Sequence, residues 1–224
     1  MQAAAEAESL PDLFRRLEAS RLLLRVDTDV EPTMYKAATI DANELAMLRS
    51  IRDVVRLGRV RRIERGRILM DEGSVPTDAS RLHVHCAAAG LNPAPAVPIF
   101  APGRITLQPV RSGLLPFNAA IAGYIEATRD DLAEKNRLCP VNRLPDTALD
   151  WLRGIVIQTR ADYRWTRQPD IAAWLERSRL NASRGMLKRA GDARVQAGLQ
   201  RYLTHVTAGL GKLEAMIAAA DAHH

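Results

Sequence analysis

The first candidate functional group is a run of small side chains at the end of an apolar stretch: Ala87, Ala88, Ala89 and Gly90. A strand that ends in such a turn can bring its backbone against a flat ligand, because no large side chain keeps the ligand at a distance. Strands of dinucleotide-binding sheets approach their cofactor in this way. An ordinary β-meander ending in a glycine turn gives the same pattern, and both interpretations stay open.

A second candidate group is polar and follows a proline-rich stretch at 91–103: Thr106, Gln108, Arg111 and Asn118. These residues surround an expected strand end and helix start, a place that commonly lines a ligand cleft. Together with the small-residue turn they are the predicted cofactor-binding residues. Helix capping, together with the ordinary polarity of residues at the edge of a sheet, explains these residues equally well. No residue is identified as a catalytic acid, base or nucleophile.

Metal and thiol chemistry are not expected. His83 and His85 share one face of an expected strand, whereas Cys86 points to the other, so the three do not converge on an ion. Cys139 precedes a proline and has no Cys-x-x-Cys partner. Gly191 and Asp192 resemble a flavin-contacting turn, but ending one helix and capping the next explains them fully.

The elements that must position these residues form two regions, 1–111 and 112–224, with a boundary near Ser112. The first region is expected to hold a β-meander and part of a dinucleotide-binding sheet. The second is expected to be helical, with tryptophans as core anchors, so the fold class is mixed α and β. The first region is predicted to contain helices after Ser9 and Asp41, strands at 22–26, 54–64, 68–70, 82–87 and 104–110, and tight turns at 65–66 and 71–73.

Composition narrows the function classes. The chain has 224 residues, of which 47% are hydrophobic and only 4% aromatic, so its core must be aliphatic. The formal charge of +6 is dispersed, whereas nucleic-acid binding needs a clustered basic face and stacking aromatics. Nucleic acid is therefore not an expected partner. The rival interpretation is a basic patch within one hairpin, at Arg59, Arg61, Arg62, Arg65 and Arg67.

The sequence favours a cytoplasmic protein without a membrane partner. The two cysteines suit a reducing compartment, and the amino terminus lacks the basic and apolar regions of a signal peptide. No apolar run approaches the length that crosses a bilayer.

Six segments resemble a group of bacterial FAD/NAD(P)-binding oxidoreductase-like proteins. The resemblance covers nearly the whole chain, as the carboxyl-terminal part of longer members. The segments are RLGRVRRIE at 56–64, HVHCAAAGL at 83–91, GRITLQ at 103–108, FNAAIAGYIEA at 117–127, KNRLCP at 135–140 and PDIAAWL at 169–175.

The resemblance implies FAD and NAD(P) as cofactors and a dinucleotide or small-molecule substrate as partner. Longer members begin with a Gly-x-Gly-x-x-Gly turn, which places backbone N–H groups against the pyrophosphate. This sequence contains no such turn, so the chain alone is expected to bind FAD weakly and to be inactive. The expected function is the carboxyl-terminal portion of a flavin-dependent oxidoreductase, completing the cofactor module and capping the substrate side. The alternative is a non-catalytic, truncated relative that self-associates through its helices.

Overall fold

A computed structural model of the chain divides it into two compact units, Ile40–Asn92 and the combination of Met1–Thr39 with Pro93–His224. The smaller unit is thus inserted into the larger one, a division that differs from the expected regions 1–111 and 112–224. The structure describes all residues except 37–38, 88–94, 112, 114, 190 and 223–224.

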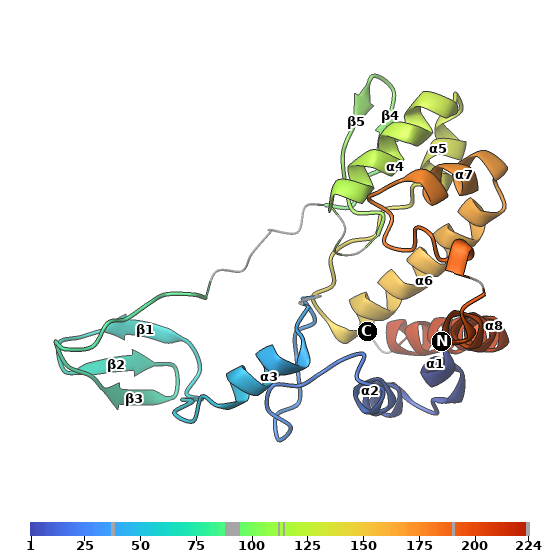
Figure 1. Cartoon of the computed structure of the whole chain (residues 1–224). Coiled ribbons are helices and arrows are strands. Elements are labelled where there is room, and N and C mark those ends of the chain that lie inside the picture. The colour runs from blue at the N-terminus through green and yellow to red at the C-terminus, as the bar shows by residue number, and fades with distance from the viewer. Residues whose placement is uncertain (37–38, 88–94, 112, 114, 190, 223–224) are drawn as a thin grey trace. The chain divides into compact units, whose positions relative to one another are not determined.

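The smaller unit combines one helix with a three-stranded antiparallel meander (Figure 1). Helix α3 (Ala42–Arg49) begins with the capping box expected from Asp41. Strand β2 (Arg67–Met70) lies between β1 (Val60–Ile63) and β3 (Gly73–Pro76). The expected meander is therefore present.

Two predicted strands are wrong. The run 22–26 contains bends and no strand, and 82–87 is not a strand either. The third strand of the meander is β3, which follows β2 after a tight turn and takes the free edge of that strand. The alternation of apolar residues at 82–87 suits a strand, but a strand also needs a hydrogen-bonding neighbour, and 82–87 has none among the described residues.

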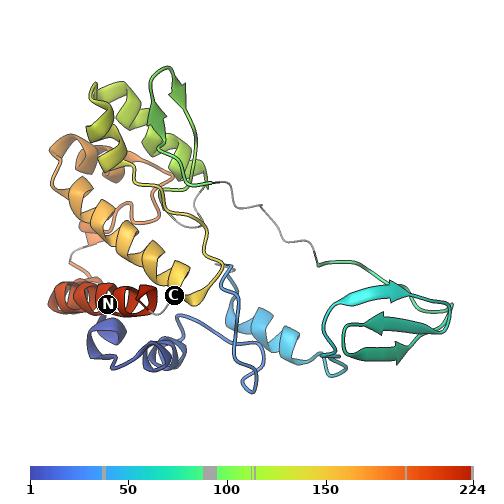
Figure 2. The same cartoon turned by 180° about the vertical axis from the view of Figure 1, so that it is seen from behind.

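The larger unit is mostly helical. Helix α6 connects two groups of helices: α4, α5 and α7 pack at one end, and α1, α2 and α8 at the other (Figure 2). The bounds are α1 Gln2–Glu6, α2 Leu10–Ala19, α4 Leu115–Thr128, α5 Leu132–Leu138, α6 Ala148–Thr166, α7 Pro169–Arg177, the 3-10 turn η1 Leu187–Arg189 and α8 Ala193–Asp221.

Each end of α6 belongs to a separate buried cluster. Trp165 packs with Phe117 in one, and Leu152 with Leu213 in the other. Aromatic rings pack together in the first cluster, where the ring centroid of Phe117 lies 5.9 Å from that of Trp165 and 6.0 Å from that of Trp174. Trp165 is fully buried, as expected of a core anchor.

The predicted strand at 104–110 is reduced to a minimal hairpin. Arg104–Ile105 (β5) pairs antiparallel with Phe100–Ala101 (β4), and residues 106–110 leave the ladder. Pro109 lies in that departing segment, where it can donate no ladder hydrogen bond. Both sheets of the described residues are antiparallel, so the parallel pairing typical of a dinucleotide-binding sheet is not found among them.

The mixed α and β class, with a helical carboxyl-terminal half, is confirmed. Within the described part of the chain, no helix is both long and apolar enough to cross a membrane.

Candidate functional site

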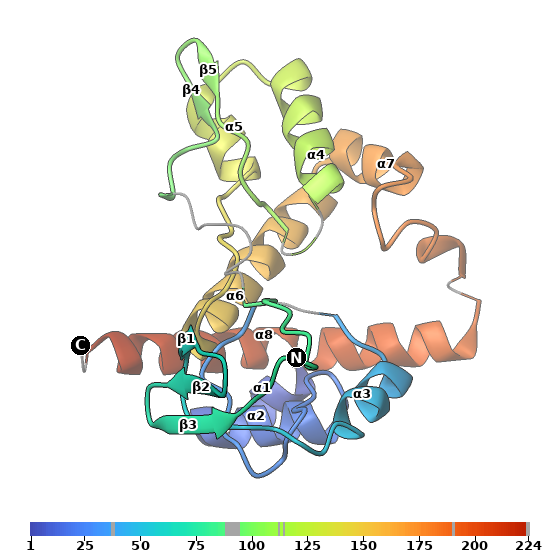
Figure 3. The ribbon, with the colours of Figure 1, turned by 90° about the vertical axis from the view of Figure 1, so that its left-hand side faces the viewer.

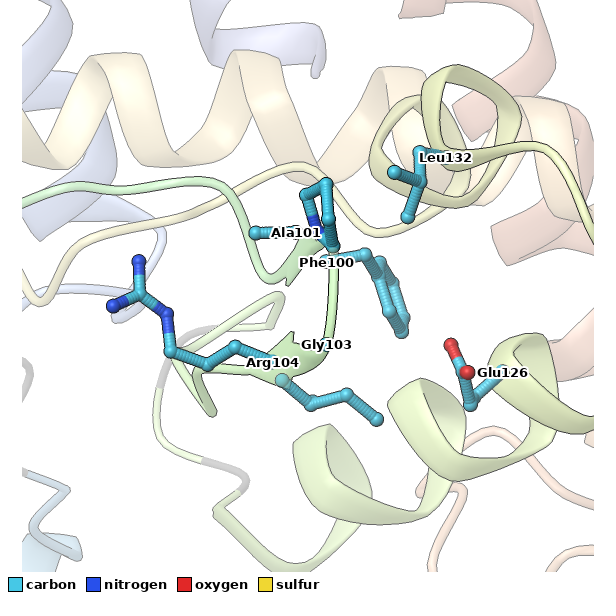
Figure 4. A pocket seen from close by; sticks show the side chains of 8 residues that line it. Phe100, Ala101, Gly103, Arg104, Glu126 and Leu132 are labelled. Carbon is cyan, nitrogen blue, oxygen red and sulfur yellow. The ribbon is translucent and has the colours of Figure 1, made fainter.

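A cavity of about 310 Å³ lies beside the β4–β5 hairpin in the larger unit (Figure 4). Its walls come from three elements: the hairpin residues 100–105, Glu126 near the end of α4, and Leu132 at the start of α5. The wall combines apolar side chains with the charged side chains of Arg104 and Glu126. Ile105 and Leu132 are 47% and 37% exposed, so apolar side chains face solvent at a hollow.

Helix α5 holds the hairpin in place. The side chain of Asn136 accepts a hydrogen bond from the backbone N–H of Phe100 at 3.0 Å and donates one to the carbonyl of the same residue at 2.8 Å. Because both backbone groups of Phe100 are bonded, its ring is fixed in the wall, where it is 2% exposed. Asp131 caps α5 by accepting from the N–H of Glu134 at 2.7 Å.

The charged side chains in the wall are Arg104 and Glu126, and Glu126 forms an ion pair with Lys135. Lys135 Nζ donates to Glu126 Oε2 at 2.8 Å and lies 5.9 Å from the ring centroid of Phe100. The lysine side chain is only 9% exposed, whereas the glutamate side chain is 42% exposed. A buried lysine needs a partner of opposite charge, and the carboxylate of Glu126 supplies it. A half-exposed carboxylate beside apolar side chains is an arrangement that can bind a small ligand.

Two predicted site residues, Arg111 and Asn118, lie together but away from this cavity wall. Asn118 Oδ1 accepts from the backbone N–H groups of Val110 at 3.1 Å and Arg111 at 2.8 Å. Its amide donates to the Arg111 carbonyl at 3.0 Å. Asn118 is buried and both its amide oxygen and its amide nitrogen bond backbone groups, which fits the structural alternative for this residue.

The guanidinium of Arg111 is also engaged by protein groups. Its Nε donates to Asp162 at 3.1 Å and its Nη1 to Asn181 at 2.9 Å. It lies 4.6 Å from the ring centroid of Phe117 and 5.0 Å from that of Trp165. Burial raises the pKa of Asp162, and the nearby Arg111 opposes that rise. The cation ties α6 to the segment after α7 within the core.

Thr106 and Gln108 position the chain that leads away from the hairpin. The backbone N–H of Thr106 donates to the Ile99 carbonyl at 2.8 Å, and the Gln108 amide donates to the Val97 carbonyl at 2.6 Å. Neither residue lines the cavity. Sequence reasoning missed Glu126 and did not identify Lys135 as a site residue, because nothing in their local spacing pairs them.

In the smaller unit, the predicted small-residue turn follows an extended, solvent-exposed segment. Leu82 is 88% and Val84 71% exposed, and Cys86 and Ala87 are exposed as well. The ring of His83 contacts Thr77, with Nε2 2.8 Å from Oγ1. Ala88, Ala89 and Gly90 lie outside the described residues.

No three His, Cys, Asp or Glu side chains in the described ranges are placed to hold a metal ion. Two carboxylates pair with three of the five meander arginines. Arg61 pairs with Asp71, and Glu64 pairs with both Arg62 and Arg67. These ion pairs offset only part of the positive charge of the meander.

The chain is similar to Uncharacterized protein Rv2000 of Mycobacterium tuberculosis and Uncharacterized protein Mb2023 of Mycobacterium bovis. Each is 42% identical over 181 residues, which cover 81% of this chain and 34% of the relative. The chain therefore spans about a third of the length of the curated relatives that it matches. No protein-family profile matches the chain, and no solved structure matches it significantly.

Proposed function

We propose that this chain supplies the closing part of an FAD/NAD(P)-binding oxidoreductase module, with the helical unit as a cap on the substrate side. The observation that carries the proposal is the order of elements in the smaller unit. A three-stranded meander is followed by an extended segment, 81–87, which leads to the small residues 88–90.

The exposure of that segment supports the same interpretation. Leu82, Val84 and Cys86 alternate with two histidines, so they share one face of an extended chain. An exposed extended segment with an apolar face is ready to pair with another strand, and soluble proteins normally cover or pair such a segment. In the proposed module, a strand of the pyrophosphate-binding part pairs with 81–87 and covers this face.

Chemistry in such a module belongs to the cofactor, and the protein orients it. This sequence lacks the glycine-rich turn that grips a pyrophosphate, so FAD retention requires a second segment. The relatives contain much sequence beyond the matched region, which makes such a segment available in them.

The test is a complementation experiment. The chain is purified alone and together with the part of Rv2000 that the match does not cover, and bound flavin is measured by absorbance after gel filtration. We expect flavin to be retained only by the mixture. Val84→Glu should abolish retention, because a charge would be placed in the new sheet. Leu107→Glu is the matched control, since Leu107 is 62% exposed and lies in the other unit.

The proposal fails if the mixture elutes as a colourless complex, or if Val84→Glu and Leu107→Glu behave alike.

A second candidate function, self-association without catalysis, is favoured by α8. Its first half exposes Leu199, Tyr202 and Leu203 by 39%, 42% and 57%. Light scattering of the purified chain tests this candidate, which requires a stable oligomer that Leu203→Glu dissociates.

A further inference from the structure

We propose that the cavity beside the β4–β5 hairpin binds a small, uncharged, largely apolar molecule that donates one hydrogen bond to Glu126. The inference is independent of the flavin proposal, because every lining residue belongs to the larger unit. If both proposals hold, the substrate of the module binds in this cavity of the helical cap.

The walls define the body of the ligand. Phe100 forms a buried surface, while Ile105 and Leu132 flank the opening and remain partly exposed. Covering exposed apolar area contributes about 25 cal/mol per Å². The volume of about 310 Å³ is at the lower end of the range found for small-molecule sites, so the ligand is small.

The ion pair defines the polar group of the ligand. Lys135 donates to Oε2 of Glu126, and the remaining oxygen, Oε1, is an acceptor on a half-exposed side chain. Figure 4 shows this carboxylate next to the ring of Phe100, whereas the Arg104 guanidinium extends away from both. A hydroxyl or amide N–H of the ligand satisfies Oε1 directly.

Charge balance at the Glu126 end of the cavity disfavours ionised ligands. Glu126 and Lys135 already neutralise each other, so a cationic amine would add an unbalanced charge close to the buried lysine. Arg104 also lines the cavity, but its guanidinium extends away from Glu126 (Figure 4), so the carboxylate would repel an anion bound beside it. A neutral donor adds no charge and keeps the existing pair intact, which makes it the favoured class.

Four probes of nearly the same shape test this ranking: benzyl alcohol, benzylamine, benzoate and benzyl methyl ether. Each is titrated into the full chain while the backbone amide signals of residues 100–105 are followed by NMR. We expect benzyl alcohol to bind at millimolar concentration, and the amine, the acid and the ether to bind at least about tenfold more weakly, since a hydrogen bond to a charged group contributes about 1.5–3 kcal/mol.

Two variants locate the site. Ile105→Trp fills the opening and should weaken benzyl alcohol binding at least about tenfold, since overpacking a filled site costs about 1–3 kcal/mol. Leu107→Trp, two residues further on and outside the cavity, should leave the affinity unchanged. Glu126→Gln should remove the preference for the alcohol over the ether, and its unfolding temperature shows whether Lys135 tolerates the change.

The inference is overturned if benzyl alcohol does not shift these amides at millimolar concentration. It is equally overturned if the charged probes bind as tightly as the alcohol, or if Ile105→Trp and Leu107→Trp have the same affinity. The flavin experiment tests Val84 in the smaller unit, whereas the probe titrations test residues of the larger unit. Either proposal can therefore fail while the other holds.

Discussion

Asn118 and Arg111 are joined in both directions: the Asn118 side chain accepts from the Arg111 N–H at 2.8 Å and donates to its carbonyl at 3.0 Å. This pair joins Arg111, in the segment before α4, to a side chain of that helix. Because Asn118 also bonds the N–H of Val110, one buried amide satisfies three backbone groups.

Asn118→Ala should therefore destabilise the larger unit strongly. The two N–H groups left without an acceptor cost about 1–3 kcal/mol each, so we expect a loss of roughly 3 kcal/mol in the free energy of unfolding. Urea denaturation followed by tryptophan fluorescence measures it. Asn136→Ala is the matched comparison, since Asn136 bonds Phe100 in the same way but is half-buried. Equal losses in the two variants would contradict this account.

Gly209 allows α1 to lie against α8 (Figure 3). A Cβ at this position would lie 2.7 Å from the carbonyl oxygen of Met1, which is too close for an atom that cannot rotate away. Gly209→Ala should cost about 1–3 kcal/mol through overpacking, reduced by up to about 1 kcal/mol of improved helix propensity.

Gly211→Ala is a control in the same helix. A Cβ there would meet nothing within 4 Å, so only the propensity gain of up to about 1 kcal/mol remains. Thermal unfolding by circular dichroism should show opposite changes in the two variants. A stabilised Gly209→Ala protein would show that α1 does not pack closely in solution.

Helices were predictable from sequence because their signals are local. Asp41 and Asp192 cap α3 and α8, and Pro169 opens α7, as their positions relative to apolar stripes indicated. Strands were less predictable, because 82–87 has the alternation of a strand but no partner among the described residues, and alternation alone does not name a partner.

The candidate site was predictable only in part, for a related reason. Thr106 and Gln108 follow the hairpin residues 100–105 in the sequence, and those hairpin residues line the cavity. Glu126 and Lys135 meet because α4 and α5 contact each other, and the bond from Arg111 to Asn181 spans 70 positions. Contacts of this kind follow from tertiary packing, which no spacing rule in the sequence encodes.

The two cysteines should differ in reactivity. Burial raises the pKa of the Cys139 thiol to about 12, so the thiol stays protonated and inert at pH 8, whereas Cys86 is exposed. A chromogenic disulfide reagent should titrate one thiol in the native chain and two after denaturation. Cys86→Ser should remove the fast-reacting thiol entirely, and a remaining fast phase would mean that the core around Cys139 opens readily.

Asp71 should make the meander sensitive to acid. The N–H of Arg59 and the guanidinium of Arg61 hold the pKa of Asp71 below its ordinary value. In the unfolded chain an aspartate binds a proton near pH 4, before the folded one does. The ionised carboxylate therefore stabilises the folded unit above about pH 4, and this contribution is lost as the pH falls towards the lowered folded pKa.

Asp71→Asn keeps an acceptor for Arg59 but removes the charge that pairs with Arg61. We expect the variant to unfold at lower urea concentration than the wild type at pH 7, with the difference shrinking below about pH 4. The NMR signal of the Leu69 amide in β2 reports unfolding of the meander. Asp78→Asn is the control, because the partners of Asp78 are Ser80 and Arg81, beyond the strands. A difference between wild type and Asp71→Asn that persists unchanged into acid would show that the charge of Asp71 does not stabilise the sheet.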